Sequence, residues 1–160
     1  MAIFLSTYTN KVDRKGRVSV PSLFRSELSR EADQSVVVFP SLQHQALECC
    51  SRRWLEDFSA NLDHMDLPAE DKDILATTIF GGSVALPMDT EGRILLPGNL
   101  LDFAGLTDQA AFFGAGATFQ IWEPSRLAAR SLQARDQARA RNISLRMIRP
   151  GNSNTGGGRP

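Results

Sequence analysis

The sequence has few of the residues that build disulfide frameworks, metal sites and nucleophilic catalytic centres. Its 160 residues include two cysteines, Cys49 and Cys50, and two histidines, His44 and His64. Adjacent cysteines rarely bridge, and no second pair exists for a disulfide framework or a zinc knuckle. The histidines have no partners at ligand spacing and are expected on the surface. We therefore expect no metal site and a reducing compartment.

Long hydrophobic runs are also missing. No apolar stretch approaches the roughly 20 residues that a membrane helix needs. The first residues, MAIFLSTYTN, lack the basic start, the long apolar segment and the cleavage site of a signal peptide. A hydrophobic fraction of 42% and a charged fraction of 22% are typical of a folded soluble protein. The expectation is a soluble, cytoplasmic chain of one domain or two small fused units.

A net charge is absent as well, which taken alone argues against a nucleic-acid partner. The charges are segregated, however. Residues 1–30 hold six bases and two acids, residues 54–108 hold eleven acids and two bases, and residues 126–160 hold eight arginines and one acid. Such runs are often solvated faces, and for the tail this interpretation stays open. At the start the bases gather around one turn, which favours a binding role.

An internal repeat organises the rest of the chain. The pattern D-x-x-G-R-x-x-x-P occurs at Asp13–Pro21 and again at Asp89–Pro97, a constant offset of 76 residues. Each copy is followed by a short helix, two apolar strands and a closing helix. The expected helices are 21–30 and 97–104, the strands are 35–39, 46–50, 110–114 and 118–122, and the closing helices are 51–62 and 124 onward. Two related units in one chain are the simplest explanation.

The repeated residues have the chemistry of a tight turn between two strands. Gly16 and Gly92 lie where a positive φ is often required, which glycine adopts freely. Asp13 and Asp89 can accept hydrogen bonds from backbone amides two residues later. The prolines end a strand and suit the beginning of the next helix. Two hairpin tips of the same construction are therefore predicted.

Helices outside the repeats are predicted from capping and periodicity. Ser51 can cap a helix with apolar residues at i, i+4 spacing. A linker helix is expected from Pro68 to Phe80, with Ile74, Leu75 and Ile79 buried and Gly81 at its end. The arginine-rich segment after Pro124 is helix-favouring, and the Gly/Asn/Pro-rich end from residue 150 to 160 is expected to be disordered.

The doubled motif, opened by FLSTYTNKVDRKGRVSVPSLFR, resembles the MraZ family of the AbrB-like (SpoVT-AbrB) superfamily. The resemblance covers residue 3 to about residue 130 and no motif beyond residue 133. It implies an α+β fold of two AbrB-like swapped-hairpin β units that form a barrel flanked by helices. The implied division is 3–62 for the first unit, 63–82 for a helical linker, 83–130 for the second unit, and 131–160 for an arginine-rich helix and disordered tail.

The resemblance also implies a function. Family members are cytoplasmic, nucleoid-associated transcriptional regulators that form homo-oligomeric rings of eight or more subunits. They bind double-stranded DNA at tandem short direct repeats upstream of their own division and cell wall operon, and their usual effect is repression. No enzymatic activity, cofactor, small-molecule substrate or membrane partner is implied.

The two predicted tips differ in charge, which selects the DNA-binding candidates. The first tip carries four bases, namely Lys11, Arg14, Lys15 and Arg17. The second carries Thr90, Glu91 and Arg93 at the positions that match the last three of them. Because phosphate repels Glu91 and attracts Lys15, the first tip is the predicted DNA contact and the second a scaffold. Within the first tip, Lys15 and Arg17 are expected to approach the DNA most closely.

Arg17 has a second interpretation that the sequence leaves open. Arginine recurs as Arg93 in the tip without a predicted DNA contact, so both arginines could pair structurally with the aspartates at 13 and 89. Arginine can also bridge guanine O6 and N7, which favours DNA contact. We therefore assign Arg17 as a DNA-binding residue. The residues assigned as turn formers are Asp13, Gly16, Asp89, Gly92 and Arg93.

Two rival functions fit the repeat less well. Two aspartates from related units could share a proton, as in aspartic proteases. Here, however, glycine follows three residues after the aspartate, where the protease pattern has two, and an arginine beside each carboxylate would keep it ionised. An antitoxin-like module that binds another protein also remains open, although such modules usually carry one hairpin unit and this chain has two.

Overall fold

The computed structural model describes residues 2–147, and the segment expected to be disordered, 150–160, lies outside them. The chain divides into two compact units, Met1–Leu127 and Ala128–Pro160. Among the described helices, none combines the length and the apolar character that crossing a bilayer requires.

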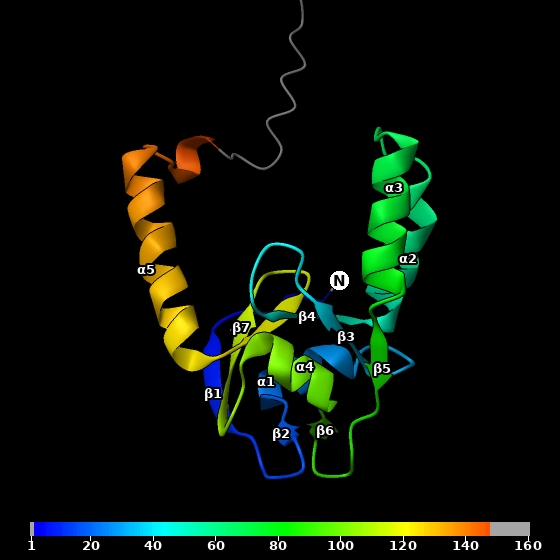
Figure 1. The fold of residues 1–160 in the computed structure, drawn as a ribbon, viewed down its shortest axis with the longest axis vertical. Helices are drawn as coiled ribbons and strands as arrows, with labels where there is room; N and C mark the ends of the chain where they lie inside the picture. Colours follow the sequence, from blue (N-terminus) through cyan, green and yellow to red (C-terminus); the bar gives the residue numbers. More distant parts are fainter. Residues whose placement is uncertain (1, 148–160) are drawn as a thin grey trace, which may run out of the picture. The chain divides into compact units, whose positions relative to one another are not determined.

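Strands and short helices alternate in unit 1 as the repeat predicts (Figure 1). The first repeat contains β1 (Thr7–Lys11), β2 (Arg17–Ser19), α1 (Ser22–Leu28), β3 (Val36–Pro40), β4 (Leu47–Ser51) and α2 (Arg52–Leu62). The linker contains α3 (Ala69–Leu75) and a π-helix (Ala76–Phe80). The second repeat contains β5 (Val84–Leu86), β6 (Arg93–Leu95), α4 (Gly98–Ala104), β7 (Gln109–Gly114), β8 (Phe119–Trp122) and α5 (Pro124–Ala140), which continues into unit 2 and precedes a 3₁₀ turn (Leu145–Met147).

The two repeats exchange their first strands. The larger sheet has the antiparallel order β1-β7-β8-β4-β3-β5, and β2 pairs with β6 in a second, two-stranded sheet. β1 pairs with β7 of the second repeat, and β5, its counterpart 76 residues later, pairs with β3 of the first repeat. The α+β class is therefore confirmed, with a swap of strands between the repeats and with β1 and β5 at the two ends of the larger sheet.

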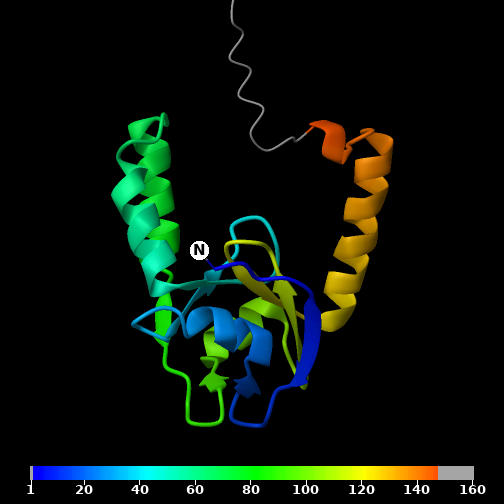
Figure 2. The ribbon, with the colours of Figure 1, turned by 180° about the vertical axis from the view of Figure 1, so that it is seen from behind.

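One hydrophobic core is shared by both repeats. Phe24 from α1 lies 4.9 Å, centroid to centroid, from Phe119 of β8, and Phe4 lies at the same distance from Phe119. All three rings are almost completely buried, and such aromatic pairs add to the stabilisation that burial alone provides. This core supports α1 and α4, which both lie above the β2–β6 pair, with α4 in front in Figure 1 and α1 in front in Figure 2.

The helical linker and α2 pack against β3 and β4 in a smaller apolar cluster. Ser51 caps α2 as predicted, since its hydroxyl accepts a 3.1 Å hydrogen bond from the Trp54 amide. Ile79 is buried as predicted, but the expected burial of Ile74 is wrong, because its side chain is 51% exposed. Positions five residues apart differ by roughly 140° around a helix, so one contact face cannot bury both isoleucines.

Candidate nucleic-acid interface

The two hairpin tips are related by local two-fold symmetry about the β2–β6 pair. Val18 is paired with Ile94 at its centre. The Val20 amide donates to the Gly92 carbonyl and the Leu96 amide donates to the Gly16 carbonyl, each at 3.0 Å. The 76-residue offset of the sequence thus becomes a physical symmetry, and it places the tips side by side (Figures 1 and 2).

Each tip is closed by an aspartate that binds two backbone amides and one arginine. Asp13 Oδ1 accepts hydrogen bonds of 2.9 Å from the amides of Lys15 and Arg17, and its Oδ2 pairs with Arg17 Nε at 2.7 Å. Asp89 repeats these contacts with Glu91 and Arg93, each at 2.9 Å. The amide two residues after each aspartate is therefore held as predicted. The exposed side chains of each tip are therefore attached to a backbone that these hydrogen bonds hold in place.

Glycine at the turn is required by conformation and by space. Gly16 has a φ of +90° and Gly92 a φ of +77°, in the region that other residues adopt at a cost. A Cβ at residue 16 would lie 2.8 Å from the Leu96 carbonyl oxygen. That oxygen belongs to the backbone that joins the two tips, so it cannot move aside without disturbing their pairing.

We predict that Gly16→Ala lowers the free energy of unfolding by about 1–2 kcal/mol from the left-handed conformation alone, and by more through the backbone contact. Gly98→Ala is the matched control, because a Cβ there meets nothing within 4 Å. It should leave stability unchanged or raise it by about 0.4–1 kcal/mol, since alanine restricts the unfolded chain. Urea denaturation followed by circular dichroism measures both. Equal stability of the two variants would contradict the turn assignment.

The two turn aspartates, Asp13 and Asp89, are held ionised. Hydrogen bonds from the backbone amide and the guanidinium of Arg17 lower the pKa of Asp13 to about 2, and the Arg93 amide lowers the pKa of Asp89 in the same way. Each aspartate is bound to its own arginine, so the two form no shared-proton dyad. Across residues 2–147, no group of three or more histidine, cysteine or acidic side chains is arranged to hold a metal ion.

The lowered pKa of Asp13 predicts a loss of stability in acid. A folded-state pKa below the ordinary 3.8 means that the aspartate contributes stability above pH 4, and that this contribution disappears as the pH falls to about 2. In Asp13→Asn the loss between pH 4 and 2 should be shallower, while stability at pH 7 is reduced. The control is Asp136→Asn, which removes an exposed carboxylate without an ion pair among the described residues. Identical pH profiles for wild type and Asp13→Asn would count against the assignment.

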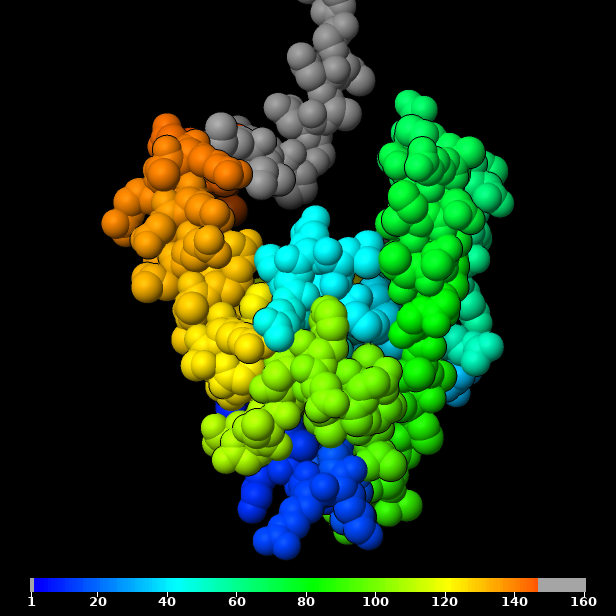
Figure 3. Space-filling view, viewed as in Figure 1, coloured from blue at the N-terminus to red at the C-terminus, as the bar shows by residue number. Residues whose placement is uncertain are grey.

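The predicted DNA-contact residues lie together at the first tip. Lys11, Arg14 and Lys15 are exposed, and the Arg17 side chain is 38% exposed. Asn10 holds β1 against β2, because its side-chain amide donates a 2.7 Å hydrogen bond to the Ser19 carbonyl. Figure 3 shows the first tip in blue at the lower end of the view, beside green atoms of the second repeat.

The two arginines of the tips differ in their partners. Arg17 pairs with Asp13 through Nε, as the structural interpretation predicted. Arg93 pairs with Asp89 through Nε and also with Glu91, from NH2 to the carboxylate oxygen at 3.2 Å. Because Lys15 replaces Glu91 in the first tip, Arg17 has no second carboxylate among its described ion pairs. The terminal nitrogens of Arg17 therefore have no ion-pair partner among the described residues, whereas a terminal nitrogen of Arg93 is paired with Glu91.

The pKa of Arg93 shows the same neutralisation. It is raised first by the hydrogen bond with Asp89, and further by the charges of Asp89, Glu91 and Asp13. The influence of Asp13 arises from the neighbouring tip, which agrees with their side-by-side positions. Arg93 is thus a structural cation paired with the carboxylates of its own tip.

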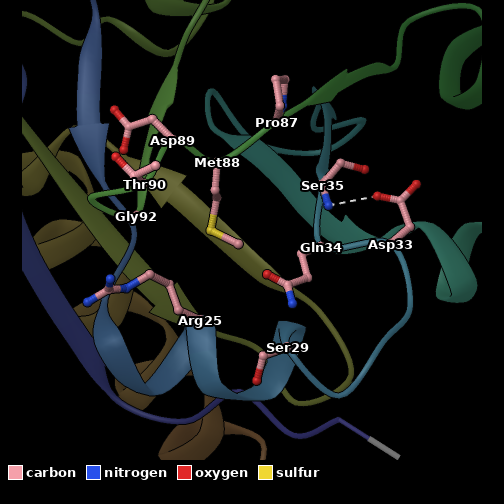
Figure 4. A pocket seen from close by; sticks show the side chains of 10 residues that line it. All are labelled: Arg25, Ser29, Asp33, Gln34, Ser35, Pro87, Met88, Asp89, Thr90 and Gly92. Carbon is pink, nitrogen blue, oxygen red and sulfur yellow. Dashed lines mark hydrogen bonds between the residues drawn. The ribbon is translucent and has the colours of Figure 1, made fainter.

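A further cation, Arg25, was not assigned from the sequence. It extends from α1 toward the second tip and lines a cavity of about 430 Å³ with Asp33, Asp89 and Thr90 (Figure 4). Its Cζ lies 2.8 Å from where a Cβ at Gly92 would be, so glycine at this position also makes room for the guanidinium. Its Nε is buried and has no hydrogen-bond partner among the described residues. The sequence did contain a signal for this residue. The 76-residue offset matches Arg25 to the uncharged Leu101, so the two repeats also differ in charge at this position.

Comparison with known proteins completes the description of the site. The model of the family described as "MraZ protein, putative antitoxin-like" matches residues 3–76 and 79–144. The chain belongs to the MraZ family. Similar proteins named "Transcriptional regulator MraZ" occur in Pelagibacter ubique, with 42% identity over 96% of this chain and 99% of the relative, and in Rickettsia bellii, with 37% identity over 91% of this chain and 98% of the relative.

The MraZ match extends further than the motifs indicated. The sequence motifs ended near residue 130, whereas the family match continues to residue 144 and so includes most of α5. A helix without turn glycines or prolines offers no fixed motif, because its similarity is spread along its length. The family match therefore includes a helix that the motifs did not reach.

Proposed function

We propose that this MraZ-family protein is a sequence-specific DNA-binding transcriptional regulator that represses its own division and cell wall operon. Its relatives are named transcriptional regulators, and that name carries no catalytic role. The observation that carries the proposal is the charge asymmetry of two otherwise equivalent tips. The two tips share the same backbone hydrogen bonds, but only the first carries a surplus of basic side chains. This difference indicates that the first tip is adapted to bind an anion.

The first tip is a turn between two antiparallel segments that carries cationic side chains, and a major groove admits a two-stranded ribbon. Arg14, Lys15 and Lys11 contact phosphates and set the register of the protein on the duplex. Arg17 reads base edges with its terminal nitrogens while Asp13 holds its Nε and fixes the plane of the guanidinium. The ion pair and the DNA contact are then compatible roles for one side chain, since a held guanidinium loses less conformational entropy on binding.

The second tip supports the first. Its glycine carbonyl bonds to Val20, directly behind the DNA-contact turn, and its acids are matched by Arg93 and by the nearby Arg25. A balanced tip beside a basic one adds rigidity without repelling the DNA. We include in the proposal that the swapped units close into a barrel, which would hold both tips at fixed separation.

One chain alone binds weakly under this proposal. Four cations neutralise about four phosphates, which gives a log–log salt slope of about −0.9 for each phosphate. A cytoplasmic, nucleoid-associated ring of eight or more subunits that presents several first tips to tandem direct repeats converts weak contacts into avidity. Oligomerisation and sequence recognition are therefore coupled.

The test is a fluorescence anisotropy titration on the DNA upstream of the operon that encodes the protein, with a scrambled duplex of equal length as control. The proposal predicts tighter binding to the upstream DNA than to the scrambled duplex. It also predicts a steep loss of affinity between about 50 and 200 mM salt, because phosphate contacts are weakened by salt. Equal affinity for both duplexes at all salt concentrations would contradict sequence-specific regulation.

A further inference from the structure

Unit 2 contains the second part of α5, from residue 128 to residue 140. Between residues 128 and 146, where side-chain burial is described, no side chain is buried. Leu132, in the middle of this part of α5, is 63% exposed. A helical segment of roughly 12–15 residues is marginal in water by itself, and helices in proteins obtain most of their stability from packing on one face. We therefore expect this part of α5 to be stabilised by packing against another surface.

One face of α5 combines apolar and basic side chains. Ala128, Leu132, Arg135 and Arg139 follow each other at i, i+4, i+7 and i+11, so they lie in a row on one side of the helix. All four are exposed, and neither arginine forms an ion pair among the described residues. We call these four residues the basic stripe.

Unit 1 carries a helical arm of the opposite charge, made of α2, α3 and the π-helix. Residues 52–80 hold seven acids and three bases. On α3, Glu70, Asp73 and Ile74 follow at i, i+3 and i+4 and share a face. All three are exposed, Ile74 at 51%, and the described ion pairs include neither acid. We call these three residues the acidic stripe.

We propose that the basic stripe of one copy of this chain packs against the acidic stripe of a second copy. Leu132 and Ile74 would form the apolar centre of the contact, which explains why the isoleucine is left exposed. Arg135 and Arg139 would face Glu70 and Asp73, and opposite charges in register steer two surfaces together and exclude misaligned pairings. Every copy carries both stripes, so the partner is the chain itself.

A contact between two different stripes is compatible with a closed ring. Because the two stripes differ, the contact is heterologous, and each copy keeps one stripe available for the next copy. Such contacts generate a ring where the rotation from copy to copy closes, and an open filament where it does not. The inference supplies contact surfaces for the ring in the proposed function and rests on that ring, but it is independent of which tip touches DNA.

The test uses complementary charge reversals in the full chain. One variant carries Arg135→Glu with Arg139→Glu, and the other carries Glu70→Lys with Asp73→Lys. Size-exclusion chromatography with light scattering, without DNA, reports the molar mass of each protein, and circular dichroism verifies that each is folded. The matched control is Arg14→Glu with Lys15→Glu, which makes the same change of charge at the first tip.

The expected result is an oligomer for the wild type and for the tip control, and a loss of mass toward the 17.6 kDa chain for each reversed variant. Mixing the two reversed variants should restore the oligomer, since the acidified α5 of one then meets the basic arm of the other. Combining all four reversals in one chain should restore it as well. Raising the salt from 0.1 to 1 M, which shortens the screening length from about 10 to about 3 Å, should weaken the assembly.

Three outcomes would overturn the inference. A wild type that is monomeric, or reversed variants that keep the wild-type mass, would show that these stripes do not join copies. Loss of the oligomer without recovery in the mixture or in the fourfold variant would show that each stripe faces some other surface. The tip control separates these results from the proposed function, because it should lose DNA binding and keep its mass.

Discussion

Lys15→Glu is expected to reduce affinity for the upstream DNA by about 100-fold or more, because it places a carboxylate against phosphate where a cation was and like charges in a contact cost several kcal/mol. Lys15 is exposed at the end of the first tip, and its amide, which donates to Asp13, is unchanged by the substitution. The fold and the oligomer should therefore survive. The loss should be similar on every sequence tested, since a phosphate contact carries no base preference.

The matched control is Glu91→Lys, at the position related to Lys15 by the 76-residue offset. It makes the opposite change of charge on a turn of the same construction. If the second tip is a scaffold, DNA affinity should change by no more than about twofold, as expected for a screened surface charge. Equal and large effects at residues 15 and 91 would contradict the asymmetry and would assign DNA contact to both tips.

Breaking the ring is expected to reduce affinity for tandem repeats by a factor of about 10²–10⁴, although all first-tip cations are retained. The variant for this test carries Arg135→Glu with Arg139→Glu, far in sequence from the tips. In the proposed ring, binding of one tip makes the next binding event intramolecular, and the reversed variant should lose that gain. On a duplex with a single recognition box the two proteins should bind with much more similar affinity.

The complementary mixture provides the control for this second experiment. Adding the protein with Glu70→Lys and Asp73→Lys should restore both the oligomer and the affinity for tandem repeats. Restored mass without restored affinity would show that the ring is not the source of avidity. Unchanged affinity in a protein demonstrated to be monomeric would show the same.

Sequence patterns were sufficient for the local structure. The turn at Asp13–Arg17 depends on a side chain that accepts its own amides and on a glycine at positive φ, and both effects act within five residues. The Ser51 cap is local in the same sense. Because the second tip repeats these residues, the charge difference between Lys15 and Glu91 could also be found without coordinates.

Contacts between residues far apart in the sequence could not be predicted from sequence patterns. The resemblance implied a strand swap, but the sheet order follows from pairings across the whole chain, such as Thr7 with Phe113. The helical period placed Ile74 in the core, whereas the arm contacts other elements through a different face. Arg25 looked like one base among six, because only the fold brings α1 next to the second tip.

The most direct test of the central claim is photocrosslinking from matched positions on the two tips. A photoreactive phenylalanine analogue is introduced at residue 15 in one protein and at residue 91 in another, and each is irradiated with upstream DNA. The account predicts a strong covalent adduct from residue 15 and little or none from residue 91. Adducts of equal yield, or an adduct from residue 91 alone, would contradict it.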